Sequence, residues 1–380
     1  MKLKEQNTSN DIKTISLFSG AGGLDIGAIM AGAYIILAND IMKEACLSYT
    51  KNIGNHIVTD DINSLMNEFE SYRDIDMVIG GPPCQGFSIA GKMDVNDQRS
   101  QLIWSYVKVI SIVKPKAFIM ENVKALGILE KWRPIREKLL LKLRSLGYSV
   151  NFMILNASDY DVPQSRERFF VIGIKGDPLL IPDWSKMILQ HSHKAPTVRE
   201  ALRILDKAGM GNNKGICKAK VTLASHPILR KSPYAGMLFN GLGRPTKIDG
   251  YSATLPASMG GNKTPIIDEK ELYENCTPWI VSYHAQIMQD PSKAVFQNAP
   301  PFLRRMTVEE AAILQTFPLD YKFCGSQSSK YTQIGNAVPC NMAKAVTKMI
   351  INVLKGKEEV VYKRHEKQAV FNFAYNEESN

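Results

Sequence analysis

The sequence has no apolar run long enough to cross a bilayer as a helix, which takes roughly 18 to 20 apolar residues. The longest candidate, residues 28–38, is interrupted by Gly32. Residues 1–11 are polar and contain no apolar core of a signal peptide. We therefore expect a cytoplasmic protein with no membrane partner.

Cysteine is scarce, with six residues in the chain of 380, and its spacing is irregular. The sequence has no Cys-x-x-Cys pair and no cluster of cysteine and histidine at the spacing of a zinc site. The cysteines are Cys46, Cys84, Cys217, Cys276, Cys324 and Cys340. Structural disulfides and a bound metal are therefore not expected.

Acidic residues are fewer than basic ones. The chain has 37 Asp and Glu against 47 Lys and Arg, which gives a formal net charge of +10. This surplus favours a polyanionic partner such as nucleic acid, although many proteins that bind none also have one. With 44% hydrophobic residues the chain can bury a substantial core, and its length predicts two domains or one domain with an insertion.

Short apolar runs alternate with amphipathic stretches in the first half, which is typical of a parallel sheet flanked by helices. The runs predict strands at residues 14–18, 34–39, 76–80, 117–120 and 169–174. Apolar residues that recur every three or four positions predict helices over 102–113 and 135–146. The fold class expected is therefore α/β.

Two more helices are expected near the end of the chain. Thr307 and Glu310 have the spacing of a capping box, which predicts a helix that runs through Gln315 and ends before Pro318. A last helix is expected over residues 341–354.

Between residues 182 and 301, Gly, Pro, Ser, Asn and Lys are frequent and no hydrophobic period is sustained. This change predicts a second, loop-rich region. We expect residues 1–185 and 331–380 to form the sheet domain, and residues 186–330 to form a smaller domain inserted into it.

A glycine-rich turn follows the first predicted strand, where residues 19–25 read Ser-Gly-Ala-Gly-Gly-Leu-Asp. Glycine lets the backbone approach a ligand closely, and Asp40, about 20 residues later, lies where a carboxylate commonly binds ribose hydroxyls. Together they predict a nucleoside cofactor, with a simple tight turn as the alternative. Asp25 occupies the third glycine position of Gly-x-Gly-x-x-Gly, which argues against a nicotinamide dehydrogenase.

Cys84 follows two prolines just after the predicted strand at 76–80. The prolines fix the backbone before the thiol, and the carboxyl end of a strand is where open α/β sheets hold ligands. A lone cysteine is often a small buried hydrophobe, but its Gly, Gln and Ser neighbours favour a nucleophile. Its thiolate would gain from nearby positive charge, for which Arg166 and Arg168 are candidates.

Two further polar motifs adjoin predicted strands. Glu121 follows the run at 117–120 and is expected to face the same cleft as Cys84, with a helix cap as the alternative. Gln-Ser-Arg-Glu-Arg at 164–168 precedes the strand at 169–174, so its two arginines on alternate positions are expected to face one polyanion. A solvated charge run is the alternative for this motif.

In the order in which they occur, these motifs resemble those of the bacterial DNA (cytosine-5) methyltransferase family. The resemblance runs from Ser16 to about Ala345 except across the loop-rich region, and it includes closing motifs at 305–318 and 333–339. It implies the Rossmann-like fold of S-adenosylmethionine-dependent methyltransferases, with S-adenosyl-L-methionine as the cofactor.

The resemblance also implies which residues bind and react. The implied cofactor-binding residues are Phe18, Gly20, Gly22, Gly23, Leu24, Asp40, Ile41, Asp61, Ile62, Pro83, Asn336 and Val338. The implied catalytic residues are Cys84, Glu121, Arg166 and Arg168. The implied DNA contacts are Gln85, Ser88, Lys92, Arg99, Gln164 and Thr254.

The implied reaction needs covalent catalysis because carbon 5 of cytosine is too weak a nucleophile to take a methyl group unaided. Cys84 would add to carbon 6, Glu121 would hydrogen-bond the N3 and amino edge, and Arg166 would steady the intermediate and nearby phosphates. The base has to flip out of the duplex. Residues 88–99 are expected to close over it, and base-reading side chains are expected between 225 and 297 of the target-recognition domain.

The expected partner is double-stranded DNA, bound by a monomer that thereby associates with the nucleoid. A cognate restriction endonuclease encoded nearby would place the chain in restriction–modification or defence. The alternatives are a tRNA cytosine-5 methyltransferase and a DNA-binding regulator without catalysis, although Cys84, Glu121, Arg166 and Asn336 argue against the regulator. A nicotinamide dehydrogenase would leave the Pro-Pro-Cys-Gln and Gln-Ser-Arg-Glu-Arg motifs unexplained.

Overall fold

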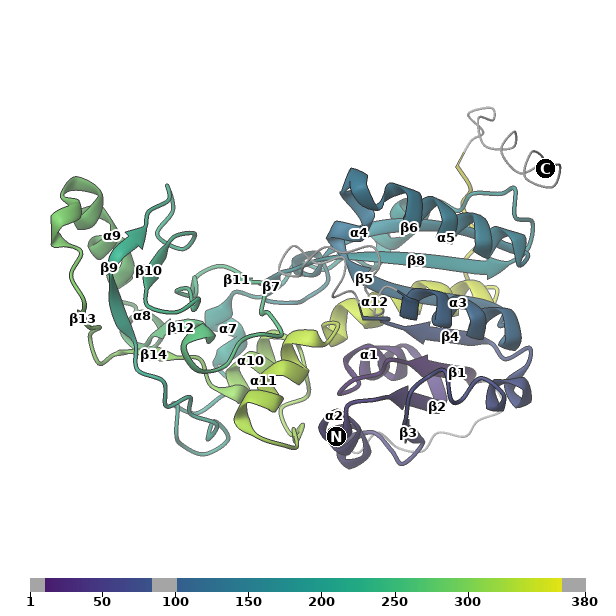
Figure 1. Ribbon diagram of the computed structural model, residues 1–380, viewed down its shortest axis with the longest axis horizontal. Helices are drawn as coiled ribbons and strands as arrows, with labels where there is room; N and C mark the ends of the chain where they lie inside the picture. The colour runs from purple at the N-terminus through teal and green to yellow at the C-terminus, as the bar shows by residue number, and fades with distance from the viewer. Residues whose placement is uncertain (1–10, 84–100, 364–380) are drawn as a thin grey trace.

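The computed structural model describes residues 11–83 and 101–363 and consists of two lobes (Figure 1). One lobe contains a seven-stranded sheet covered by helices, and the other is built of short strands, short helices and loops. Cys84, Gln85, Ser88, Lys92 and Arg99 lie outside the described residues. No helix in the described part of the chain is both long and apolar enough to span a membrane.

The large sheet has the strand order β3-β2-β1-β4-β5-β8-β6. Its strands are β1 Ile12–Leu17, β2 Ala33–Asp40, β3 Ile57–Thr59, β4 Met77–Gly80, β5 Ala117–Val123, β6 Tyr148–Asn156 and β8 Glu167–Lys175. The first five strands pair in parallel, whereas β8 is antiparallel to both β5 and β6. The α/β class expected from the sequence is confirmed.

All five predicted strands are present, and β3 and β6 were not predicted. Strand β3 has only three residues at the edge of the sheet and shows no apolar run. Strand β6 contains Ser149 and Asn151, which interrupt its apolar pattern although both are buried. Their side chains donate hydrogen bonds to the carbonyl oxygens of Asp177 and Pro182, and these bonds satisfy the buried polar groups.

Helices cover both faces of the sheet. Helices α1 (Gly23–Ala31) and α12 (Cys340–Leu354) pack on one face, and α3 (Leu102–Val113) and α5 (Arg133–Ser145) pack on the other. Helix α2 (Lys43–Asn52) joins β2 to β3. The predicted helix at 102–113 is confirmed with those bounds, and the expected helices at 135–146 and 341–354 are confirmed to within two residues.

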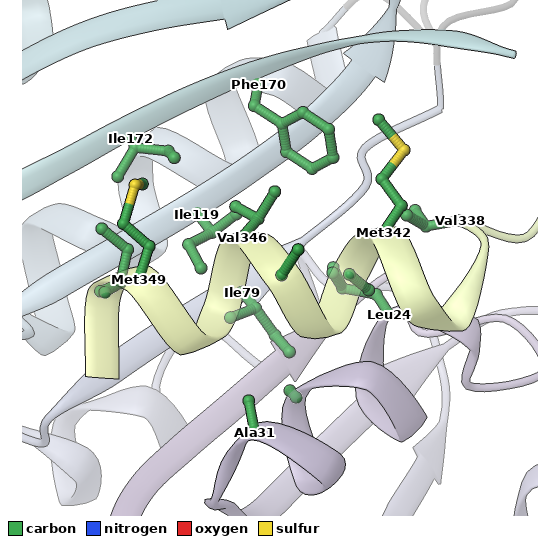
Figure 2. Close-up of a cluster of buried hydrophobic side chains, with 14 of the residues drawn as sticks. Leu24, Ala31, Ile79, Ile119, Phe170, Ile172, Val338, Met342, Val346 and Met349 are labelled. Carbon is green, nitrogen blue, oxygen red and sulfur yellow. The ribbon is translucent and has the colours of Figure 1, made fainter. Parts of the chain in front are cut away.

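Helix α12 brings the end of the chain back onto the sheet. Its Met342, Val346 and Met349 pack against Ile79 of β4 and Ile119 of β5 (Figure 2). Burying each of these helix side chains contributes roughly 1.5–3 kcal/mol of hydrophobic stabilisation. The helix therefore anchors the segment just before it, which belongs to the candidate site.

The second lobe has its own apolar core. It contains a three-stranded antiparallel sheet in the order β10-β9-β13, and an antiparallel pair formed by β12 and β14. Its elements are β9 Thr222–Ile228, β10 Met237–Phe239, β12 Ile266–Asp268, β13 Gln297–Asn298, β14 Leu303–Arg305, α8 Glu269–Glu274 and α9 Trp279–Gln289. Leu223 and Leu238 of the sheet pack against Ile280 and Ile287 of α9.

Three helices lie between the two lobes (Figure 1): α7 Val198–Leu202, α10 Val308–Leu314 and α11 Gln327–Asn336. They share one apolar cluster with Ile26 of α1. The predicted capping box is confirmed, because the Thr307 hydroxyl accepts a hydrogen bond from the Glu310 amide while the Glu310 carboxylate accepts one from the Thr307 amide. The shared cluster runs across the predicted domain limit at 330, so that limit stays a prediction.

Candidate functional site

The glycine-rich turn between β1 and α1 has a strained backbone. Phe18, Gly20 and Gly22 all have positive φ, at 56°, 55° and 79°. This conformation is easy for glycine and unfavourable for phenylalanine, by roughly 1–2 kcal/mol. Within the turn, the Ser19 hydroxyl donates to the carbonyl oxygen of Ser16. A strained turn at the carboxyl end of a strand is typical of a ligand-binding loop.

Gly23 brings this turn against the segment that precedes α12. A Cβ atom at position 23 would lie 2.4 Å from the carbonyl oxygen of Val338, which is far closer than real contacts allow. Val338 and Leu24 pack in the same buried cluster. The structure therefore brings together predicted cofactor residues more than 300 positions apart, although the side chain of Leu24 belongs to the core and not to the surface of the site.

Asp40 and Ile41 lie beside the glycine-rich turn at the end of β2. The Asp40 carboxylate accepts hydrogen bonds from the amides of Gly20 and Met42, each 2.8 Å long. Burial raises the pKa of Asp40 despite these bonds. Each oxygen keeps a second lone pair for a hydroxyl donor. Ile41 exposes 66% of its surface. The Asp40 carboxylate and an exposed apolar side chain are therefore neighbours, which suits the sugar and the base of a nucleoside.

The predicted Asp61-Ile62 segment follows β3 at the same edge. The Asn39 side-chain amide donates to the carbonyl oxygens of Val58 and Asp60, which ties this segment to the end of β2. Asp61 is exposed, whereas Ile62 is buried in the core on the α3 face of the sheet. Only Asp61 and the local backbone are therefore open to a ligand.

Glu121 lies inside β5, which pairs with β8 in the sheet. The sequence placed it after the strand, but β5 continues to Val123 because Glu121 and its neighbours pair with β8. Its carboxylate forms an ion pair with Arg168, with 2.9 Å between Oε1 and Nε. Burial raises the pKa of Glu121, although the charges of Arg168 and Arg166 oppose that shift. The helix-cap alternative is wrong, because a buried, ion-paired side chain within a strand cannot cap a helix.

Asn122 connects Glu121 to the segment that carries Cys84. Its side-chain amide donates to the carbonyl oxygen of Pro82, 3.1 Å away. A Cβ atom at Gly81 would approach Glu121 Oε2 to 3.1 Å, so this turn runs directly beside the carboxylate. Pro83, a predicted cofactor residue, is half-buried at the end of this described segment. The sequence did not single out Asn122, whose one signal was its position beside Glu121.

Gln164 and Arg166 are located differently from the prediction. Gln164 is fully buried. Its side-chain oxygen accepts a hydrogen bond from the Leu255 amide, and its side-chain nitrogen donates one to the Leu314 carbonyl oxygen, so its predicted DNA contact is not available in this structure. Arg166 is also buried, and its terminal nitrogens donate to backbone carbonyl oxygens. Arg168, and not Arg166, forms the ion pair with Glu121. The alternative that residues 164–168 are a solvated charge run is therefore wrong.

Thr254 and Asn336 are both exposed. The Thr254 hydroxyl donates to the carbonyl oxygen of Ser165, beside the short parallel pair of β7 (Gln164–Ser165) and β11 (Ser252–Ala253). Asn336 is the last residue of α11, two positions before Val338. Among the described residues, no group of three or more His, Cys, Asp and Glu side chains could hold a metal ion.

Comparison with known proteins decides the family. The model of C-5 cytosine-specific DNA methylases matches residues 12–352. This chain belongs to that family. The methylase is 31% identical to a type II methyltransferase of Haemophilus parahaemolyticus over 353 residues, 89% of this chain and 86% of the relative. It is 32% identical to one of Methanothermobacter thermautotrophicus over 346 residues, 90% of this chain and 97% of the relative.

Solved structures agree on the fold. The S. pombe Dnmt2 methyltransferase matches with a TM-score of 0.62 at 21% identity, covering 91% of this chain and 99% of that one. The Entamoeba histolytica methyltransferase EhMeth matches with a TM-score of 0.62 at 19% identity, covering 90% and 99%. The chain is a DNA (cytosine-5) methyltransferase and uses S-adenosylmethionine as its methyl donor, so the nicotinamide dehydrogenase is wrong.

Proposed function

We propose that this methylase modifies the cytosine of one short duplex sequence, after that base has flipped out of the helix, by covalent attack from Cys84. The observation that carries the proposal is the buried Glu121–Arg168 pair beside the Pro82 turn. A carboxyl group held at this place can meet the edge of an extruded base next to a nucleophile. Extrusion itself costs a few kcal/mol.

The reaction would proceed in three steps. The Cys84 thiolate forms a bond to carbon 6, which turns carbon 5 into an enamine-like nucleophile. S-adenosylmethionine would supply a methyl group carried on a sulfonium sulfur. Carbon 5 would bond to that methyl carbon as the methyl–sulfur bond breaks, leaving S-adenosylhomocysteine. Loss of the carbon-5 proton then returns an electron pair to the ring and expels Cys84.

Glu121 would hold the N3 and amino edge of cytosine during these steps. To donate a hydrogen bond to N3, its carboxyl group must carry a proton. The raised pKa of Glu121 favours that proton at a higher pH than for an ordinary glutamic acid. Arg168 binds Oε1 and so fixes the orientation of the group, which leaves Oε2 for the base.

The cofactor would lie across the carboxyl ends of β1 and β2. Ile41 would cover the adenine, Asp40 would accept hydrogen bonds from the ribose hydroxyls, and the turn from Phe18 to Gly23 would hold the methionine end. Asn336 would complete the site from the end of α11.

The type II methyltransferases among its relatives favour a role in restriction–modification. In this role the enzyme would act as a cytoplasmic monomer, bound to the nucleoid through double-stranded DNA. Its partner would be a restriction endonuclease encoded nearby, and modification would protect the host sequence from that endonuclease.

The test is methyl transfer from labelled S-adenosylmethionine to a mixed-sequence duplex and, separately, to tRNA, followed by bisulfite sequencing of the duplex. We expect protected cytosines within one recurring sequence. The Cys84→Ser variant serves as the control, and it should lose turnover while it still binds S-adenosylhomocysteine. Labelled tRNA with unlabelled DNA would overturn the proposal, as would full activity of Cys84→Ser.

A further inference from the structure

Arg166 joins three segments that are far apart in the sequence. Its Nη1 donates to the carbonyl oxygen of Leu255 at 2.9 Å, and its Nη2 donates to those of Gly335 and Ala337 at 2.8 and 3.0 Å. The side chain exposes only 1% of its surface. Such a buried, charge-assisted set of hydrogen bonds holds these backbone segments in one fixed arrangement.

Two of the three carbonyl groups that Arg166 binds lie at the end of α11. A helix leaves its last carbonyl oxygens without intrahelical partners, and a positive charge there also interacts favourably with the helix dipole. The Gly335 carbonyl is one of these groups, and Ala337 is the residue directly after the helix. A Cβ atom at Gly335 would lie 2.4 Å from the Pro256 carbonyl oxygen, so the helix end touches the segment after Leu255.

A second buried connection supports the same junction. The Gln164 amide oxygen accepts from the Leu255 amide, and its nitrogen donates to Gln315 Oε1 at 3.1 Å. The Gln315 nitrogen in turn donates to the carbonyl oxygens of Ile334 and Ala337. Both Gln164 and Gln315 are fully buried. The hydrogen bonds of Arg166 and those of the Gln164–Gln315 pair therefore both join Leu255 to the turn at residues 334–337.

The two ends of this junction belong to different binding regions. Leu255 follows β11 in the region proposed to recognise DNA, while the Gly335–Ala337 turn leads to Val338, whose carbonyl oxygen abuts Gly23 of the cofactor loop. In addition, Arg166 is two residues before Arg168, which binds Glu121.

We propose that Arg166 is a positioning residue that couples DNA binding to cofactor binding by clamping the Leu255 segment to the Gly335–Ala337 turn. The inference rests on the proposed function, because it takes the Leu255 region to be part of the DNA-binding lobe. DNA that orders this region then also orders the turn beside the cofactor, and each ligand tightens the binding of the other by the same factor.

The test compares Arg166→Lys with the wild-type enzyme. Lysine keeps the positive charge near Glu121 but loses the planar fork that reaches several carbonyl groups at once. Titration calorimetry gives the Kd of S-adenosylhomocysteine without and with a saturating duplex that carries the sequence found by bisulfite sequencing. A coupling of ordinary size lowers that Kd by about 5- to 150-fold in the wild type, and we expect this factor to approach one in Arg166→Lys.

Arg305→Lys is the matched control. Arg305 is equally buried and donates to the carbonyl oxygens of Thr264, Lys220 and Asn240, all within the second lobe. Its replacement removes a fork of the same kind without touching the junction. We expect a lowered Tm but an unchanged coupling factor. Thr254→Val, which deletes the exposed hydrogen bond to Ser165, provides a milder change at the junction if Arg166→Lys fails to fold.

The outcomes separate the possibilities. Loss of coupling in Arg166→Lys or reduced coupling in Thr254→Val, with coupling kept in Arg305→Lys, supports the clamp. Wild-type coupling in both junction variants overturns it, as does equal loss of coupling in Arg305→Lys. If no methylated sequence is found for the wild type, the proposed function has failed before the clamp is tested.

Discussion

At the scale of single residues, the site depends on a charge pair that is costly to bury. Glu121 and Arg168 lose most of their hydration, and their mutual attraction offsets this only if geometry is good and the remaining polar atoms find partners. Here the ion pair uses Oε1 and Nε, while Arg168 Nη1 also donates to the Glu167 carbonyl oxygen. A buried ion pair at the carboxyl edge of a sheet, where its desolvation is unfavourable for stability, fits a role in binding.

We expect Glu121→Gln to reduce kcat by about 100- to 10,000-fold, the usual contribution of a positioned acid or base. Glutamine keeps the shape but can neither hold the carboxyl proton nor form the ion pair with Arg168. The Kd of S-adenosylhomocysteine should not change. Steady-state methyl transfer and calorimetry measure these two quantities. The control is Glu137→Gln, an exposed residue of α5 that pairs with Arg133. Wild-type kcat in Glu121→Gln would rule out the assigned role.

A second residue prediction concerns Asp25, which lies fully buried at the start of α1. Burial raises its pKa from 3.8 to about 7, although the Tyr49 hydroxyl donates to its carboxylate at 2.9 Å. The folded state therefore binds the proton of the Asp25 carboxyl group more tightly than the unfolded state does, and ionisation of Asp25 destabilises the fold. The contribution of Asp25 to stability is thus largest below about pH 4 and falls until about pH 7.

Urea unfolding of wild type and Asp25→Asn at several pH values measures this effect. The stability of the variant relative to the wild type should increase by up to about 1.4 kcal/mol per pH unit between pH 5 and about pH 7, then level off. His56 contacts Tyr49 in both proteins, so its own titration largely cancels in the difference. Asp249→Asn, at an exposed carboxylate paired with Arg199, should show no such rise. A difference independent of pH would contradict the assignment.

The residue types of the site could be read from the sequence, but their contacts could not. Glu121 and Asp40 were identified because each follows a short apolar run at a strand end. By contrast, nothing in the order of letters separates Arg166, which binds backbone, from Arg168, which binds Glu121. The difference arises because β8 begins at Glu167, so only Arg168 belongs to the strand that pairs with β5.

At the scale of elements, the turn into α1 is closely packed against the segment before α12. Gly23 permits this approach because it has no Cβ atom. We expect Gly23→Ala to raise the Kd of S-adenosylmethionine and to destabilise the fold by about 1–3 kcal/mol, as overpacking generally does. Calorimetry and urea unfolding measure the two effects.

Gly176→Ala is the matched control for this change. A Cβ atom at Gly176 would meet only Ser149 Oγ at 3.5 Å, an ordinary contact. That variant should bind the cofactor as the wild type does. If Gly23→Ala also bound it normally, the close approach to Val338 would not matter for the cofactor site.

Helices and strands differed in how well the sequence predicted them. The helix at 102–113 was predicted with its bounds because its apolar residues face the sheet at a regular spacing. Strand β5 was predicted too short, since Glu121 and Asn122 near its end are polar and are held by pairing with β8. Polar residues inside β6 hid that strand for a similar reason: their partners come from distant loops.

At the scale of the whole molecule, the charge of +10 is a feature that matches a polyanionic substrate. If the enzyme neutralises about six phosphates, its affinity for a duplex should fall by about a thousandfold between about 50 and 200 mM salt. Fluorescence anisotropy with a labelled duplex measures this dependence. The Kd of S-adenosylhomocysteine, measured across the same salt range without DNA, should change far less. A DNA affinity independent of salt would exclude extensive phosphate contacts.

The α/β class, most strands of the sheet and the types of residue at the site could be predicted from the sequence alone. These follow from local patterns, namely apolar periodicity and polar residues at strand ends. The folded structure was needed to show that α12 packs beside α1 on one face of the sheet, that Val338 meets Gly23, and that Arg166 joins Leu255 to the end of α11. These contacts link residues far apart in the chain, and they depend on packing that no local pattern encodes.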